Sequence, residues 1–150
     1  MFRNFVGAAS SVASFVLAAV WIAGAAAAQT AGEPPDLTGT WTGNAKAVSS
    51  GQNPYRPNAS GAANFSDEEL TFTFNVAEQH DERFSGTKSA GGRTETLIGS
   101  LRPPDYTQGV FLDEDGRFDF VVRDPTTIDL CYEHIRTDGR VVACYTLKRQ

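Results

Sequence analysis

Few residues of this sequence are of types that carry chemistry, and one histidine stands out among them. His134 lies two residues after Tyr132 in an alternating segment, so both side chains are predicted to share one face of a strand. An interior imidazole could orient a ligand or act as a base, and a hydrogen-bonded core histidine is the competing interpretation. Glu133 should point to the opposite face. No acid/base pair stands out, so an isomerase or cyclase using Tyr132 and His134 ranks below the two functions considered below.

Metal and cofactor chemistry find little support. The chain has two histidines and two cysteines, and a zinc site of the common type would need nearly all of them. His80 precedes two acidic residues at a predicted hairpin tip, where we expect a solvated turn. The acidic run over residues 113–116, with Asp119, lacks the spacing and the downstream glutamate of a calcium loop, so an acidic hairpin turn is expected. We predict neither a metal nor a cofactor.

Cys131 and Cys144 are the only cysteines, so a single intramolecular pairing is possible. A four-residue loop that ends at Gly139, with this glycine at positive φ, would place Ile135 opposite Arg140. Counting outward from that pair places the two cysteines opposite each other. We therefore predict a disulfide on the outer face of the last hairpin, worth roughly 3 kcal/mol in the chain-entropy model.

The N-terminal segment has the pattern of an export signal. Arg3 precedes an uncharged apolar run over residues 12–28, which ends in four alanines. Small residues at that point suit a signal peptidase, so we predict a signal peptide over residues 1–28 with cleavage after Ala28. The protein is then expected to be secreted or periplasmic, with no membrane span after cleavage.

The remaining chain is predicted to be one small domain. Residues 29–37, which contain Gly32, Pro34 and Pro35, are expected to form a flexible lead, and residues 38–150 a single domain. Hydrophobic residues make up 41% of the chain, enough for one packed core. The chain has 13 Lys+Arg against 18 Asp+Glu, and this acidic balance argues against nucleic acid as a partner.

Alternation of apolar and polar residues recurs through the domain and predicts eight strands without a helix. The predicted strands cover residues 38–48, 70–76, 83–87, 94–101, 106–112, 118–122, 128–134 and 141–147. An all-β, eight-stranded antiparallel up-and-down barrel is expected, because closure removes exposed strand edges; a two-sheet β-sandwich is the alternative. Residues 49–66 are rich in Ser, Gly, Asn and Pro and predict a long loop.

The start of the first predicted strand carries a Gly-x-Trp motif at Gly39 and Trp41. In an exported eight-stranded chain this motif resembles the lipocalin and avidin-like barrels of the calycin type. The resemblance implies that a late basic side chain, Arg149 or Lys148, stacks on the tryptophan. Biotin binding of the avidin type is not expected, because Gly43 stands where that family places an asparagine and its additional tryptophans are absent.

Two functions from different classes remain. The first is binding of a small apolar or amphipathic ligand inside the barrel, suggested by Gly43, Ala45 and Ala47 facing an aromatic interior. The candidate ligand-binding residues are Trp41, Phe74, Phe120, Tyr132, His134 and Tyr145. The second is an envelope protein-interaction or inhibitor module with a solid core, which would engage a protein partner through the exposed loop over residues 49–66.

Overall fold

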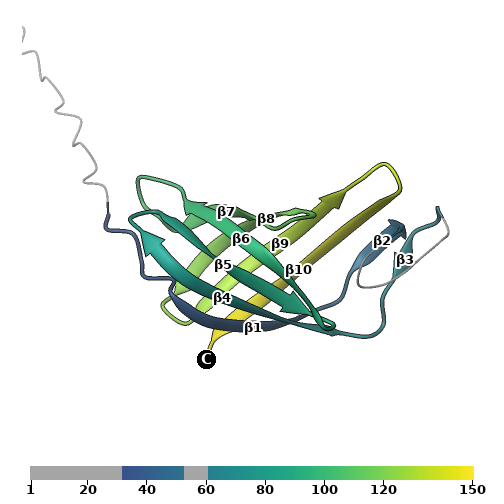
Figure 1. The fold of residues 1–150 in the computed structure, drawn as a ribbon, viewed down its shortest axis with the longest axis horizontal. Helices are drawn as coiled ribbons and strands as arrows, with labels where there is room; N and C mark the ends of the chain where they lie inside the picture. Colours follow the sequence, from purple (N-terminus) through teal and green to yellow (C-terminus); the bar gives the residue numbers. More distant parts are fainter. Residues whose placement is uncertain (1–31, 53–60) are drawn as a thin grey trace, which may run out of the picture.

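The computed structural model describes residues 32–52 and 61–150. The predicted signal peptide, its cleavage site and the middle of the predicted loop over residues 49–66 lie outside the described residues. The described chain is all-β and closes into an eight-stranded antiparallel barrel (Figure 1). In the two described ranges, no helix is long and apolar enough to cross a membrane.

Within residues 32–52 and 61–150, ten strands form one sheet. They are β1 (Gly39–Ala45), β2 (Val48–Gly51), β3 (Asn64–Phe65), β4 (Leu70–His80), β5 (Arg83–Ala90), β6 (Arg93–Leu101), β7 (Gln108–Leu112), β8 (Arg117–Asp124), β9 (Thr127–Ile135) and β10 (Gly139–Arg149). The ring runs β1-β4-β5-β6-β7-β8-β9-β10, and pairing of Trp41 with Arg149 closes it. The predicted barrel is therefore confirmed over the alternative sandwich, because β1 and β10 cover each other's edges.

Strands β2 and β3 lie outside the ring. Val48 of β2 pairs with Val142 near the start of β10, and Phe65 of β3 pairs with Val48. The β9–β10 hairpin extends beyond the neighbouring strands in Figure 1, and β2 pairs with this extension. The predicted loop over residues 49–66 is thus wrong at its two ends, because β2 pairs with β10 and β3 pairs with β2, which gives their backbone groups partners that composition alone did not reveal.

The last hairpin has the predicted register. Ile135 pairs with Arg140, and Cys131 pairs with Cys144. The two cysteines form the predicted disulfide, with their Cα atoms 4.0 Å apart. Because β9 alternates buried and more exposed residues, the disulfide lies on the outer face of the barrel, as expected.

Gly139 has a different role from the predicted one. It does not adopt a positive φ. A Cβ atom on Gly139 would instead lie 2.0 Å from the carbonyl oxygen of Gln52, the residue after β2. The glycine is needed because the two backbones approach closely there, and the sequence pattern of the hairpin contains no information about that contact.

The two ends of the barrel differ. Residues 32–37 contact one of them, the lead end: Gly32 donates to the carbonyl of Pro104, and buried Leu37 donates its N–H to Gln79 Oε1. These residues, predicted to be part of a flexible lead, are therefore anchored to the barrel. The opposite end, which holds the turn between β9 and β10, is the hairpin end.

Candidate functional site

The predicted ligand-binding residues fall into two groups along the barrel. Trp41, Phe74 and Phe120 are each at most 3% exposed and line a cavity of about 20 Å³ nearer the lead end. That volume is room for about one water molecule, whereas small-molecule pockets measure roughly 300 Å³ or more. This apolar half of the interior is completed by Leu37, Val76, Phe84, Leu97, Phe111, Ile128 and Leu147.

Gly43, one of the small residues of the first strand, is small because of a backbone contact. A Cβ on Gly43 would lie 2.3 Å from the carbonyl oxygen of Thr146, so its absence allows β1 and β10 to approach. Ala45 is 3% exposed. The observation that suggested an interior ligand from sequence is therefore explained, at Gly43, by backbone contact.

Arg149 covers Trp41 at the lead end. Its guanidinium carbon lies 4.5 Å from the centre of the indole ring, and it donates to the backbone carbonyls of Thr38 and Asp36. The indole Nε1 donates to the carbonyl of Leu37 at 2.9 Å. The stacking expected at Arg149 or Lys148 is thus made by Arg149, and it seals this end of the core.

Tyr132, His134 and Tyr145 form the second group. His134 is 2% exposed and faces the interior, as predicted, and its Nδ1 lies 3.2 Å from the Tyr132 hydroxyl. Tyr145 stacks on Phe72 with ring centres 5.4 Å apart. Glu133 is exposed, so the expected separation of His134 from this carboxylate is confirmed.

The most concentrated chemistry lies beside this second group, around Lys88 and Glu95, which were not predicted as site residues, and it includes Asp113 and Asp115 of the acidic turn. Lys88 of β5 is 1% exposed, and its ammonium pairs with Glu95 Oε2 at 2.6 Å and with Asp113. Both carboxylate side chains are 0% exposed. The ammonium also lies 5.3 Å from the centre of the Tyr132 ring and 5.4 Å from that of Phe118.

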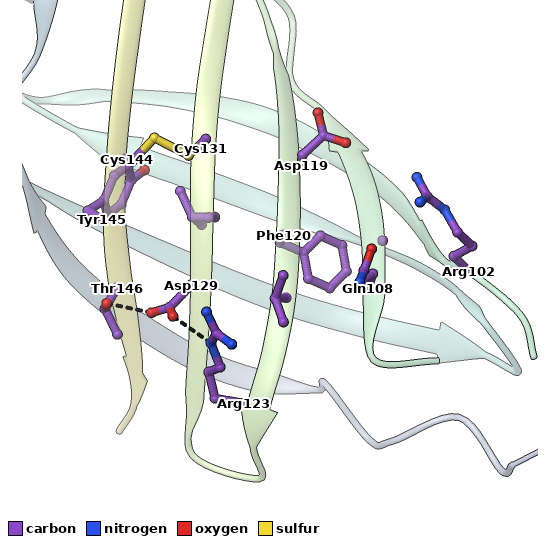
Figure 2. A pocket seen from close by; sticks show the side chains of 13 residues that line it. Arg102, Gln108, Asp119, Phe120, Arg123, Asp129, Cys131, Cys144, Tyr145 and Thr146 are labelled. Carbon is purple, nitrogen blue, oxygen red and sulfur yellow. Dashed lines mark hydrogen bonds and ion pairs between the residues drawn. A yellow bond between two sulfur atoms is a disulfide. The ribbon is translucent and has the colours of Figure 1, made fainter. Parts of the chain in front are cut away.

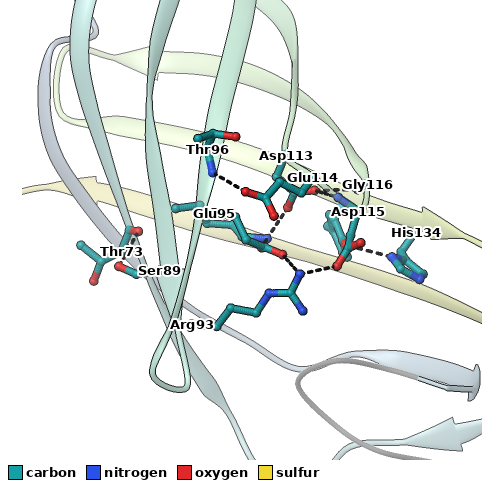
Figure 3. Close-up of polar contacts among 12 residues, drawn as sticks. Thr73, Ser89, Arg93, Glu95, Thr96, Asp113, Glu114, Asp115, Gly116 and His134 are labelled. Carbon is teal, nitrogen blue, oxygen red and sulfur yellow. Dashed lines mark hydrogen bonds and ion pairs between the residues drawn. The ribbon is translucent and has the colours of Figure 1, made fainter.

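The ion pairs continue toward the hairpin end (Figure 3). Arg93 lies between Glu95 and Asp115, at 2.6 and 2.8 Å. Asp115 also pairs with Arg136 from the β9–β10 turn. We call these residues, three of each sign, the charged cluster: Lys88, Arg93, Glu95, Asp113, Asp115 and Arg136. Lys88, Glu95 and Asp113 are buried and therefore need charged partners, whereas Arg93 and Arg136 are partly exposed. Together the ion pairs join β5, β6 and the turns at the hairpin end.

A signal for one ion pair of this cluster, Lys88 with Glu95, is present in the sequence. Gly91 and Gly92 have φ values of 56° and 80°, as a two-residue hairpin turn of type I′ requires. That turn places Lys88 directly opposite Glu95. Lys88 is four residues after Phe84 on the same strand, so both side chains point into the barrel. The Lys88–Glu95 ion pair could therefore have been predicted to lie in the interior.

The acidic turn over residues 113–116 binds its own backbone and neighbouring cations. Asp113 Oδ1 accepts from the N–H groups of Asp115 and Gly116, and its other oxygen pairs with Lys88. The expectation of a hairpin turn is met. Among the described residues, no group of three or more His, Cys, Asp or Glu could hold a metal ion. His80 is 76% exposed at its own hairpin.

The outer surface carries larger hollows than the apolar half of the interior. A groove of about 540 Å³, which we call the disulfide groove, lies over β7 to β10 beside the disulfide (Figure 2). Within it, Asp129 accepts hydrogen bonds from the Thr146 hydroxyl and from Arg123. These two bonds lower the pKa of Asp129 below its usual value, and the bond from Thr146 has the larger effect. A second hollow, the lead-end cleft, measures about 690 Å³.

Comparison with known proteins adds no assignment. No protein-family model, curated protein or solved structure matches the chain. The fold and the contacts above are therefore the basis for a functional interpretation.

Proposed function

We propose that this protein is an exported binding module that recognises a protein partner with its outer surface, while the barrel serves as a rigid scaffold. One observation carries the proposal. The apolar half of the interior leaves a cavity of about 20 Å³, whereas the lead-end cleft on the surface offers about 690 Å³. Ligand-sized space thus lies outside this half of the barrel.

The charged cluster supports the same interpretation. Lys88 and Glu95 are each 1% exposed and pair with each other, so a ligand entering between them would have to replace a buried ion pair. Separating buried charges without equivalent partners costs several kcal/mol. If these side chains have a purely structural role, the ion pair never has to be separated.

Export is supported by the sequence pattern of residues 1–28 and by the disulfide between Cys131 and Cys144. Disulfides persist mainly in oxidising compartments. Contact with a partner through residues 49–66 stays a prediction; of the described part of that segment, Phe65 is 71% exposed.

Interior binding of a small apolar or amphipathic ligand is the second candidate. It is favoured by the Tyr132–His134 hydrogen bond, a polar pair set among aromatic rings. Ligand pockets commonly place a few polar groups in such surroundings. Of the predicted residues, Tyr132, His134 and Tyr145 would contact such a ligand.

Native mass spectrometry of the protein purified from its own host separates the two candidates. We expect the protein without a retained small molecule, and no change in Trp41 fluorescence with a panel of fatty acids, aromatics and isoprenoids. A partner should be captured by a photo-crosslinking amino acid placed at exposed Thr107, beside the lead-end cleft. A retained small molecule together with quenching of Trp41 would replace this proposal by the interior-ligand function.

A further inference from the structure

The lead-end cleft has an apolar floor. It lies where residues 32–37, the connection between β6 and β7 and the turn after β8 meet. Tyr106 and Val122 line it and are partly buried against the hydrophobic core, and Pro35 and Pro125 add apolar surface. Tyr106 has a φ of 51°, which is rare for a bulky residue and occurs disproportionately at ligand-contacting sites.

Three carboxylates surround this floor in the same local structure. Asp36, Asp105 and Asp124 each accept hydrogen bonds from the N–H and the hydroxyl of the threonine two residues later. The hydrogen bond from the threonine hydroxyl, and to a lesser degree that from the threonine N–H, lowers the pKa of Asp36 and of Asp124 below the usual value. Both carboxylates therefore carry negative charge at neutral pH. Glu33 adds a fourth carboxylate to the lining.

The two arginines of the cleft have partners within the protein, and the charge of Arg149 also helps to lower the pKa of Asp36. Arg149 stacks on Trp41 and donates to two backbone carbonyls. Arg123 donates to Asp129 at 2.7 Å, on the side of the disulfide groove. Four carboxylates against two guanidinium groups leave the lining with an excess of negative charge beside an apolar surface.

We propose that the lead-end cleft binds an extended segment of the partner protein through a Lys or Arg side chain next to an aromatic or large aliphatic one. The cation would lie near Asp105 and Asp124, and the apolar side chain would cover Tyr106 and Val122. Charge complementarity selects this occupant, because an acidic segment would add to the negative excess of the lining and a purely apolar one would not offset it. The inference rests on the proposed recognition of a protein partner and names the chemistry of that partner.

The test uses the blocked tetrapeptide acetyl-Ala-Lys-Phe-Ala-amide, titrated into the ¹⁵N-labelled protein and followed by amide chemical shifts. We expect saturable shifts at Tyr106, Thr107 and Thr126. Replacing the peptide's lysine by glutamate should abolish them, and replacing its phenylalanine by alanine should weaken them. Asp105→Asn with Asp124→Asn should raise the Kd about threefold to tenfold, since each exposed pair contributes up to about 1 kcal/mol.

The matched control is the pair Asp119→Asn and Glu133→Gln, which removes the same charge outside the cleft and should leave the Kd within about twofold. Asparagine retains the oxygen that accepts from the threonine N–H, so the turns should persist.

Equal binding of the glutamate peptide, or shifts confined to the disulfide groove or to β2 and β3, would overturn the assignment of this cleft. Saturation by 2-phenylethylammonium but not by the lysine peptide would overturn the protein segment as occupant. Neither result depends on whether native mass spectrometry finds the barrel empty, so the two proposals can fail separately.

Discussion

The two halves of the barrel interior are filled in opposite ways. Near the lead end, aromatic and aliphatic side chains pack against one another, with Phe84 and Phe120 edge to face at 5.9 Å between ring centres. Near the hairpin end, Lys88 and Glu95 are buried to the same degree as those apolar residues. One half is thus held by contact area, and the other by paired charges.

This difference determines how each half responds to change. Apolar packing has no direction, so substitutions that conserve volume are tolerated. A buried ion pair depends on both partners, because removal of one leaves the other charged and without compensation. The two halves should therefore differ most in their tolerance of substitutions that keep the size of a side chain.

The largest effect is expected for Lys88→Met. The substitution keeps the length of the side chain but leaves Glu95 and Asp113 without the ammonium. We expect a loss of about 3–5 kcal/mol in the free energy of unfolding. Chemical denaturation of the disulfide-intact protein measures it. Lys46→Met, at an exposed residue, is the control and should change stability by less than about 0.5 kcal/mol. Equal stability of the two variants would contradict a structural role for the cluster.

A matched pair on β6 sharpens the comparison. Glu95 and Leu97 are successive inward residues of the same strand, 1% and 2% exposed. Glu95→Gln removes the charge that faces Lys88 and Arg93, and we expect a loss of about 2–3 kcal/mol. Leu97→Met keeps volume and polarity, and should cost less than about 1.5 kcal/mol. Thermal unfolding of both variants tests the difference, and the reverse order would show that packing dominates in both halves.

The smallest effect concerns the carboxylates at the rim of the apolar half. The pKa of Asp36 is lowered chiefly by the Thr38 hydroxyl. Because the folded value lies below the unfolded one, ionised Asp36 stabilises the fold above about pH 4, and the contribution is lost as the pH falls through the folded value. Asp36→Asn should therefore be slightly less stable than the unchanged protein at pH 7, with the gap closing toward pH 2. Melting temperatures of both proteins measured from pH 7 to pH 2 test this. A difference in melting temperature that stays constant over this pH range would exclude ionisation of Asp36 as its cause.

Some of these features could be predicted from local sequence and others could not. Turn length and alternation were sufficient for the register that joins Cys131 to Cys144 and for the inward position of His134. They were not sufficient for Asp113, whose partner Lys88 lies two strands away around the ring. Nor did they reveal why Gly43 is small, since the reason is a carbonyl on β10.

The sequence by itself determined the all-β class, the eight ring strands and the single disulfide, because alternation and turn chemistry act between residues that are near in the chain or in one hairpin. Only the tertiary structure decided how the interior is filled, with a cavity of about 20 Å³ in one half and a charged cluster in the other. It also brought three Asp-x-Thr turns, at Asp36, Asp105 and Asp124, around one cleft. Closure of the ring is the physical reason, since it places segments together whose separation along the chain carries no local signal.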